Sequence, residues 1–312
     1  MTPTRLRPLS LSDIFDEGFD LYKRNFAALI LVYAIVAVPT KVLESWISLR
    51  FLPHLSGLSG STTDILESLN AMAGGAAILI PVSLLSFAVS FSALATASAG
   101  AYLGHPITLR LAYRRPLRQI LRLFGLSLLY SLSLVVGVIC CYVGVFYPVT
   151  VYLFAVHTFA LEGQGAFGAL RRSRELAKPD ANRALSCLIS LALLAYVWMI
   201  GLQYPLNYLL ETVLKVTPGA SGWLSASAGV PGVSLRDQIL SQITSGIATL
   251  FVMPFVACVI TVLYYDVRVR TEAFDMEFLA ESLHYPPLSS LQSFPPPLLQ
   301  TTPPPFVSGR PR

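Results

Sequence analysis

Residues 123–161, LFGLSLLYSLSLVVGVICCYVGVFYPVTVYLFAVHTFAL, contain no Asp, Glu, Lys or Arg over 39 positions. A helix that crosses a bilayer needs about 20 apolar residues, so this stretch is too long for one crossing and suits two. Gly137 and Gly144 lie near its middle, where the chain could reverse direction. The sequence therefore predicts two membrane-spanning helices here, over residues 123–140 and 144–161.

Other uncharged stretches predict four more spans on either side of this one. The first is short, and we extend it through Lys41 and Glu44, which lie on one helix face near one end of the span. A Lys in that position can extend its ammonium group to the membrane interface. The remaining spans are expected over residues 26–48, 76–99, 185–209 and 239–264.

The composition agrees with a polytopic membrane protein. Of the 312 residues, 54% are hydrophobic and only 12% are charged, whereas soluble domains carry roughly 25% charged residues. The four cysteines lie in apolar stretches and form no Cys-x-x-Cys motif, so we expect no metal or cofactor. The fold class expected is an all-α bundle of six transmembrane helices with interfacial amphipathic helices.

The distribution of positive charge predicts the orientation. With six spans, 18 of the 22 Lys and Arg residues fall on one side and 4 on the other. Positive residues remain on the cytoplasmic side of a membrane, so both termini are expected there. No apolar stretch precedes Phe26, and the first span is therefore expected to be an uncleaved anchor. A single helix over 123–161 would instead place the two arginine-rich connections on opposite sides.

Residues 1–25 are expected to contain an amphipathic helix. Ser10 and Asp13 have the spacing of a capping box. Two interpretations remain open, a helix lying in the cytoplasmic interface or one packed on the bundle. The apolar face of the helix is formed by Leu11, Ile14, Phe15, Phe19 and Tyr22.

The connection after residue 109 carries arginines at four-residue spacing, interleaved with leucine and isoleucine. Such a stretch gains on the order of 1 kcal/mol per charge from anionic headgroups. The alternative is that these charges only set the topology. Pro116 is expected to interrupt the stretch. The candidate anionic-lipid contacts are Arg110, Arg114, Arg115, Arg118 and Arg122.

Residues 266–285 are expected to form a cytoplasmic helical segment after the last span. Asp266 lies just beyond Tyr264 and Tyr265, which mark the interface as aromatic residues often do. The carboxylate is expected to pair with an arginine of the connection after residue 161, which would clamp the two segments together. The candidates are Arg171, Arg172 and Arg174.

The tail, residues 286–312, is rich in proline and is expected to be disordered with polyproline II character. It could serve as a spacer or as a docking ligand for a protein partner.

Three segments together resemble a known bacterial family. They are PLSLSDIFDEGFDLYKRNF (8–26), FALEGQGAFGALRRSRELAKPD (159–180) and LYYDVRVRTEAFDMEFLAESL (263–283). The family is named after the membrane portion of glycerophosphoryl diester phosphodiesterase, and the resemblance implies a helical bundle in the bacterial cytoplasmic (inner) membrane. In the two-part enzymes a separate soluble barrel performs catalysis. Only 47 residues follow Tyr265, so phosphodiesterase activity is not expected.

The function expected is that of a non-catalytic membrane scaffold or membrane-organising module, with membrane lipids rather than nucleic acid as partners. Residues 163–168 match G-x-G-x-x-G but follow a membrane span rather than a strand, so they predict no nucleotide site. One alternative is a transporter or channel for a small or amphipathic solute. It requires a polar cavity lined by the span prolines, Pro39, Pro81, Pro148, Pro205 and Pro254. The other alternative is an intramembrane lipid-modifying enzyme, which requires converging ionisable groups.

Overall fold

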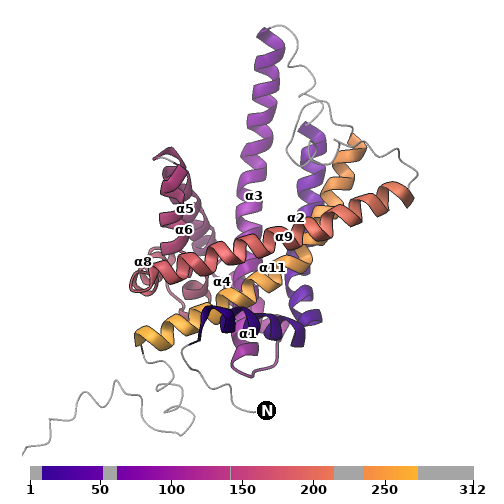
Figure 1. Cartoon of the computed structure of the whole chain (residues 1–312). Helices are drawn as coiled ribbons and strands as arrows, with labels where there is room; N and C mark the ends of the chain where they lie inside the picture. The colour runs from indigo at the N-terminus through magenta and orange to yellow at the C-terminus, as the bar shows by residue number, and fades with distance from the viewer. Residues whose placement is uncertain (1–8, 52–61, 141, 214–234, 273–312) are drawn as a thin grey trace, which may run out of the picture.

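A computed structural model describes residues 9–51, 62–140, 142–213 and 235–272, and within these all regular structure is helical. Five of the described helices are long and apolar enough to cross a membrane, which indicates a membrane-embedded protein. They are α2 (Phe26–Phe51), α3 (Thr62–Tyr102), α5 (Ile120–Ile139), α9 (Ala181–Val213) and α11 (Leu235–Glu272) (Figure 1). The expected all-α class is confirmed, and all of residues 273–312, including the proline-rich tail and the second part of the expected segment 266–285, lie outside the described residues.

The continuous helix expected over residues 144–161 is not found. The chain instead forms the short helices η2 (Tyr142–Val145), α6 (Phe146–Val151), α7 (Ala155–His157) and η3 (Thr158–Glu162). The Ser173 hydroxyl explains one break, because it donates to the Val151 carbonyl at 2.9 Å and accepts the Phe154 N–H at 3.1 Å. A buried backbone can leave the helix where another group satisfies its polar atoms.

The reversal between α5 and α6 occurs where the two glycines predicted it. A Cβ placed on Gly144 would lie 2.6 Å from the Gly137 carbonyl oxygen, and one on Gly137 would lie 3.0 Å from the Gly144 oxygen. The two backbones therefore approach so closely that only glycine fits without a shift. This contact holds residues 142–151 against the end of α5.

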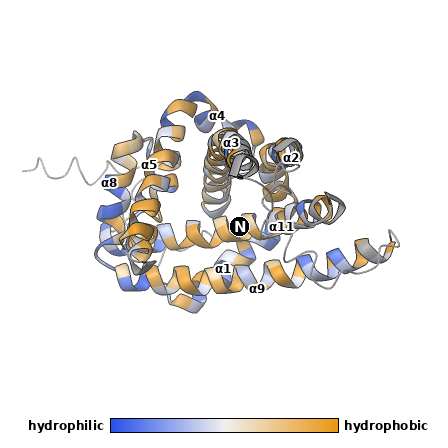
Figure 2. Cartoon of the chain, turned by 90° about the horizontal axis from the view of Figure 1, so that it is seen from above, coloured by the Kyte–Doolittle hydropathy of each residue, from blue (hydrophilic) through white to orange (hydrophobic). Residues whose placement is uncertain are grey.

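Helix α11 lies at the centre of the arrangement and contacts α1, α2, α3, α8 and α9. Helices α2 and α3 stand side by side, and both are seen nearly end-on in Figure 2. Helices α9 and α11 run obliquely across them, with α9 along the outer edge (Figures 1 and 2). The largest fully buried side chains include Tyr264, Phe154 and Phe159.

Helix α1 (Leu11–Arg24) begins with the expected capping box, since the Ser10 hydroxyl accepts the Asp13 N–H and the Asp13 carboxylate accepts the Ser10 N–H. Its buried face packs on α11, where a Cβ on Gly18 would lie 2.7 Å from Cγ2 of Val259. Tyr22 donates a hydrogen bond to the Phe251 carbonyl at 3.0 Å. Of the two interpretations left open, the structure therefore supports a helix packed on the bundle.

Two short helices complete the end of the molecule at which α1 lies, α4 (Leu109–Arg118) and α8 (Ala166–Ala177). The expectation that Pro116 interrupts the basic stretch is wrong, because Pro116 is buried within α4. The break comes at Gln119, which separates α4 from α5.

Candidate functional site

The two arginine-rich connections lie at the same end of the molecule. The Arg115 guanidinium donates to the carbonyl oxygens of Ala160 and Leu161, the latter at 2.7 Å, so α4 lies against the end of η3. Gly163 follows with φ +75°, and its position is next to the Arg115 side chain. This arrangement agrees with the charge distribution that predicted both connections on one side of the membrane.

The Asp266 carboxylate is fully buried and holds three partners. It accepts the Leu9 N–H at 2.7 Å, Arg183 Nη2 at 2.9 Å and Arg270 Nε at 3.1 Å. Both guanidinium groups also donate to the Leu9 carbonyl. This group, which we call the Asp266 cluster, joins the segment before α1, the first turn of α9 and the end of α11.

The predicted partners of Asp266 need correction. Its ion pairs go to Arg183 and Arg270 and not to Arg171, Arg172 or Arg174. Arg171 pairs with Glu175 on the exposed side of α8, and Arg174 is also exposed. The sequence could not select Arg183, because a helix-to-helix pair depends on how α9 crosses α11.

Arg172 nevertheless connects the same two segments through other carboxylates. It pairs with Glu162 at 2.9 Å and with Glu272 at the end of α11. Tyr264 donates to the other Glu162 oxygen at 2.7 Å. Burial lowers the pKa of Arg172, but the two carboxylates outweigh it, and the pKa lies above its ordinary value. The predicted clamp between α11 and the connection after residue 161 therefore exists with different pairs.

All five arginines predicted to contact lipid are exposed, and α4 presents four of them. Leu111, Leu117 and Leu121 are 55%, 59% and 83% exposed among them. The opposite side of α4 is fixed to the bundle, because Tyr113 is buried and its hydroxyl donates to the Val32 carbonyl. Burial also raises the pKa of Tyr113 to about 12. We call this surface the α4 basic face; it consists of Arg110, Arg114, Arg115, Arg118 and Arg122.

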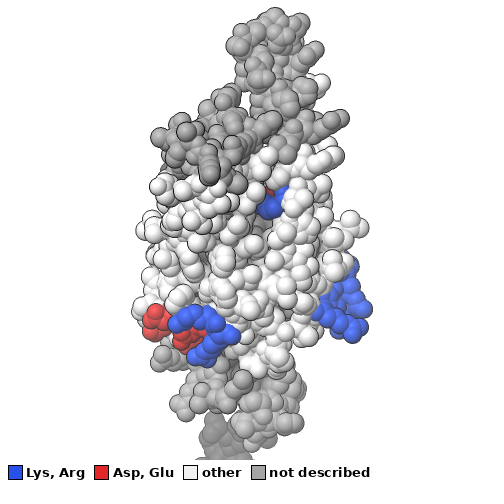
Figure 3. Space-filling model, turned by 90° about the vertical axis from the view of Figure 1, so that its right-hand side faces the viewer, with Lys and Arg blue, Asp and Glu red and all other residues white. Residues whose placement is uncertain are grey.

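Figure 3 shows one side of the molecule, where Lys and Arg gather towards the lower end of the described surface. A further basic group with an acidic atom beside it lies midway up an otherwise uncharged face (Figure 3). On this side of the molecule, most of the visible charged groups thus lie at its lower end, where Figure 1 places α1.

A buried chain of hydroxyl and imidazole groups lies between α3, α7 and α11, and sequence reasoning missed it. The Thr261 hydroxyl lies 2.7 Å from Ser98 Oγ and 3.1 Å from His157 Nε2. The His157 ring stacks on Tyr264 with 5.7 Å between ring centroids. Small hydroxyl residues inside apolar stretches are a signal for helix contact, but they do not identify the partner.

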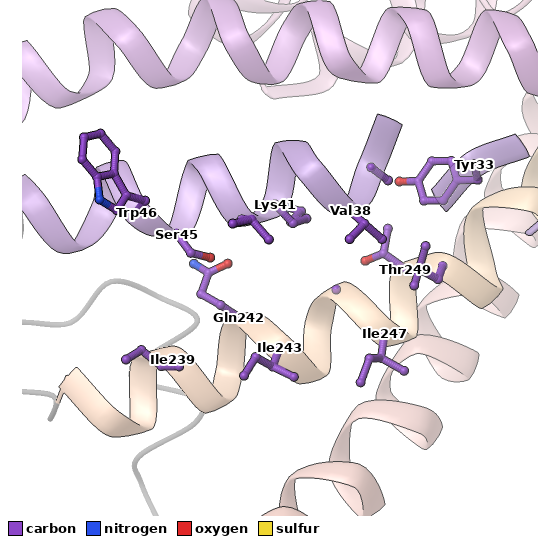
Figure 4. A pocket seen from close by; sticks show the side chains of 14 residues that line it. Tyr33, Val38, Lys41, Ser45, Trp46, Ile239, Gln242, Ile243, Ile247 and Thr249 are labelled. Atoms are coloured by element: carbon purple, nitrogen blue, oxygen red, sulfur yellow. The ribbon is translucent and has the colours of Figure 1, made fainter. Parts of the chain in front are cut away.

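A groove runs between α2 and α11, away from the charged end, with a volume of about 460 Å³ (Figure 4). Lys41 lies in it and pairs with Glu44 at 2.7 Å, and Glu44 accepts a hydrogen bond from Ser83 of α3 at 2.7 Å. A second cavity of about 260 Å³ lies among α3, α5 and residues 149–156 and is mainly apolar. None of the five span prolines lines either of these two cavities. Pro148 lines a third, mainly apolar cavity of about 460 Å³ between α5 and residues 144–152.

Within the described residues, no group of three or more His, Cys, Asp and Glu side chains is placed to hold a metal ion. Comparison of the chain with family models, with curated proteins and with solved structures finds no match.

Proposed function

We propose that this protein is a non-catalytic, multi-pass protein of the bacterial cytoplasmic membrane that organises the bilayer by holding anionic lipids at the α4 basic face. The observation that carries the proposal is the exposure of five arginines, with Leu111, Leu117 and Leu121 among them, along α4 and the first turn of α5, where α4 is fixed to the bundle. In this proposal the charged end and both termini lie in the cytoplasm. Residues 142–162 form a broken crossing, fourth in chain order, which brings the total to six and returns the chain to the cytoplasmic side.

The chemistry of the α4 basic face suits a membrane surface of negative charge. A guanidinium group can donate two parallel hydrogen bonds to one phosphate, which a lysine cannot do. The leucines between the arginines can enter the boundary between headgroups and acyl chains. Tyr113 and Arg115 hold α4 on the bundle, so the spacing of the remaining guanidinium groups is fixed before a lipid arrives.

The position of the charged residues argues for a scaffold rather than for the two alternatives. Asp266, Glu162 and Arg172 are engaged in ion pairs that tie helices together. The groove, the second cavity and the cavity beside Pro148 are all mainly apolar, and Pro148 is the one span proline that lines any of these three, so they do not form the polar path along the proline breaks that a transporter requires. A transporter built on proline breaks and an enzyme built on converging carboxylates both have less support.

The family resemblance also remains a proposal, and one feature of the fold supports it. The three resembling segments meet in space, because Leu9 contacts Asp266 and Arg172 contacts Glu272. Residues that carry the resemblance thus form the contacts between helices at the charged end. This would explain their pattern without any catalytic activity.

The test is lipid selectivity in nanodiscs that contain phosphatidylglycerol and phosphatidylcholine. Spin-labelled lipids report how strongly the reconstituted protein prefers the anionic lipid. Each arginine contributes at most on the order of 1 kcal/mol to the binding of anionic lipid. The triple variant R110Q/R114Q/R118Q removes three such contributions and should therefore lose most of the preference for phosphatidylglycerol.

Two controls define the result. R171Q removes an exposed arginine from α8, where it pairs with Glu175, and should leave the preference nearly unchanged. The triple Arg-to-Lys variant keeps the charge and should retain much of it. Equal selectivity of the wild type and the triple Gln variant would contradict the proposed function.

A further inference from the structure

The groove between α2 and α11 carries its charged and amide groups towards one end. Lys41, Ser45 and Gln242 lie towards the end marked by Trp46 (Figure 4). The Ser45 and Gln242 side chains approach each other across the groove in this view. The part further from Trp46 is lined by Val38 and Ile247 together with two hydroxyl residues, Tyr33 and Thr249 (Figure 4). The Lys41 cation therefore lies towards one end of a lining that is otherwise mainly apolar, as the headgroup and chain of a lipid would require.

Lys41 is held in place but keeps donor capacity. Its ammonium group pairs with one Glu44 oxygen at 2.7 Å, and the second Glu44 oxygen accepts from Ser83. An ammonium group has three N–H donors, so one ion pair leaves capacity for a ligand oxygen. The side chain is 45% exposed, while that of Glu44 is 15% exposed. The groove thus presents the cation more than the carboxylate.

The position along α2 places Lys41 in the half of the membrane away from the charged end, from which a Lys can extend its ammonium group towards the interface. At about 1.5 Å per residue, Lys41 lies roughly 22 Å along the helix from Phe26, in a hydrocarbon core about 30 Å thick. Trp46 is 65% exposed beyond it, as expected for a residue in an interfacial aromatic belt. A lipid headgroup at that interface would meet Lys41, and its chain would run towards the bilayer centre.

The groove is also open towards the lipid. Val42 and Trp46, which line it, are 66% and 65% exposed, and Ile239 and Ile243 on the other side are more than 40% exposed. A ligand can therefore enter sideways from the bilayer. The groove volume of about 460 Å³ can take one acyl chain of a lipid, while the rest of the molecule stays in the bilayer.

We propose that this groove binds one phospholipid, with an acyl chain along Val38, Ile247 and Leu250 and a phosphate oxygen on Lys41, Ser45 and Gln242. The three polar side chains all carry hydrogen-bond donors, which match the acceptor oxygens of a phosphodiester. This site is formed by α2 and α11, in the membrane half opposite the α4 basic face. The proposal therefore goes beyond the proposed function.

The experiment is native mass spectrometry of the full chain in detergent, in the R110Q/R114Q/R118Q background so that the α4 basic face does not contribute. The protein is titrated with phosphatidylglycerol, with diacylglycerol of the same chains and with glycerol phosphate. We expect one molecule of phosphatidylglycerol to bind saturably. Diacylglycerol should bind at least tenfold more weakly, and no binding of glycerol phosphate should be detected.

Two variants separate this site from general lipid adhesion. A Cβ on Gly246 meets nothing within 4 Å, so Gly246→Phe should fill the groove without a backbone clash and weaken binding at least tenfold. Gly201 on α9 is equally open and lies outside the groove lining, so Gly201→Phe is the matched control and should bind normally.

The double variant K41M/E44Q removes both members of the ion pair, so no carboxylate is left without its partner. This variant should weaken the binding of phosphatidylglycerol about tenfold and leave the binding of diacylglycerol unchanged. Equal binding by Gly246→Phe and Gly201→Phe, or equal effects of K41M/E44Q on the two lipids, would overturn the proposal. If Gly246→Phe does not fold, the K41M/E44Q result alone decides. None of these outcomes depends on the α4 basic face.

Discussion

Helices α11 and α9 are similar in sequence character and opposite in environment. Both contain long apolar stretches of nearly equal hydropathy, Ile239–Glu272 and Ala181–Leu210. In the most apolar 18-residue window, 61% of the residues of α11 are buried by the protein, against 11% for α9. Hydropathy therefore identified both as membrane helices but did not show which one forms the core.

The residues at the two surfaces explain the difference. The buried part of α11 combines small or hydroxyl-bearing residues, such as Ala257, Cys258 and Thr261, with large ones such as Phe255 and Tyr264. Most of α9 presents larger side chains outward, such as Leu193 and Tyr208, which are 64% and 67% exposed. Lipid chains are as apolar as a protein core, so close packing and hydrogen bonds, rather than hydrophobicity, hold membrane helices together. Apart from Asn207, the buried side chains described in α9 are those of Ala184, Cys187 and Leu191, in its first turns near the Asp266 cluster.

The largest effect is expected at the Asp266 cluster, where α11 holds both α9 and the segment before α1. Asp266→Ala would leave two guanidinium groups and the Leu9 N–H without their acceptor. Removing one partner of a buried ion pair costs about 3–5 kcal/mol. Chemical unfolding in detergent micelles should show this loss.

The matched control for Asp266→Ala is Glu175→Ala, which breaks the exposed Arg171 pair of α8. An exposed pair is worth about 0–1 kcal/mol. Similar stabilities for the two variants would mean that the Asp266 cluster does not hold the helices together.

A smaller effect is expected where α1 packs on α11. Gly18→Leu would place side-chain atoms against Val259, since even a Cβ would lie 2.7 Å from its Cγ2. Overpacking of this kind costs about 1–3 kcal/mol. Gly201→Leu on α9 meets open space and should change the free energy of unfolding by no more than about 0.5 kcal/mol. Thermal melting of the two purified variants checks the contrast, and equal melting temperatures would contradict the tight contact.

The smallest effect is expected from one hydroxyl group in each helix. Thr261→Val keeps the shape of the side chain but removes the group that joins Ser98 and His157, at a cost of about 1–2 kcal/mol. Thr212→Val on α9 loses only a bond to the Tyr208 carbonyl on an exposed surface and should be nearly neutral. Unfolding curves of the two variants measure the difference between their free energies of unfolding. Equal values would show that the Thr261 hydroxyl does not join the helices.

Several elements could be predicted because their energies are local. The uncharged stretches located α2, α3, α5, α9 and α11, since transfer of a segment into lipid depends on its own composition. The helices extend beyond the expected spans, because α3 begins at Thr62 rather than at residue 76 and α11 ends at Glu272 rather than at residue 264. The Ser10–Asp13 capping box followed from spacing along one chain segment. Gly137 and Gly144 marked the reversal after α5 because glycine permits close backbone approach.

The sequence by itself therefore determined that the chain is helical, that it enters a membrane and that its arginine-rich connections belong together. Only the tertiary structure decided that Asp266 pairs with Arg183, that Ser173 breaks the helix over residues 144–161, and that α11 rather than α9 is the core. The reason is physical. Partition into lipid is a property of each segment, whereas the partner of a buried polar group depends on which helices cross at that point.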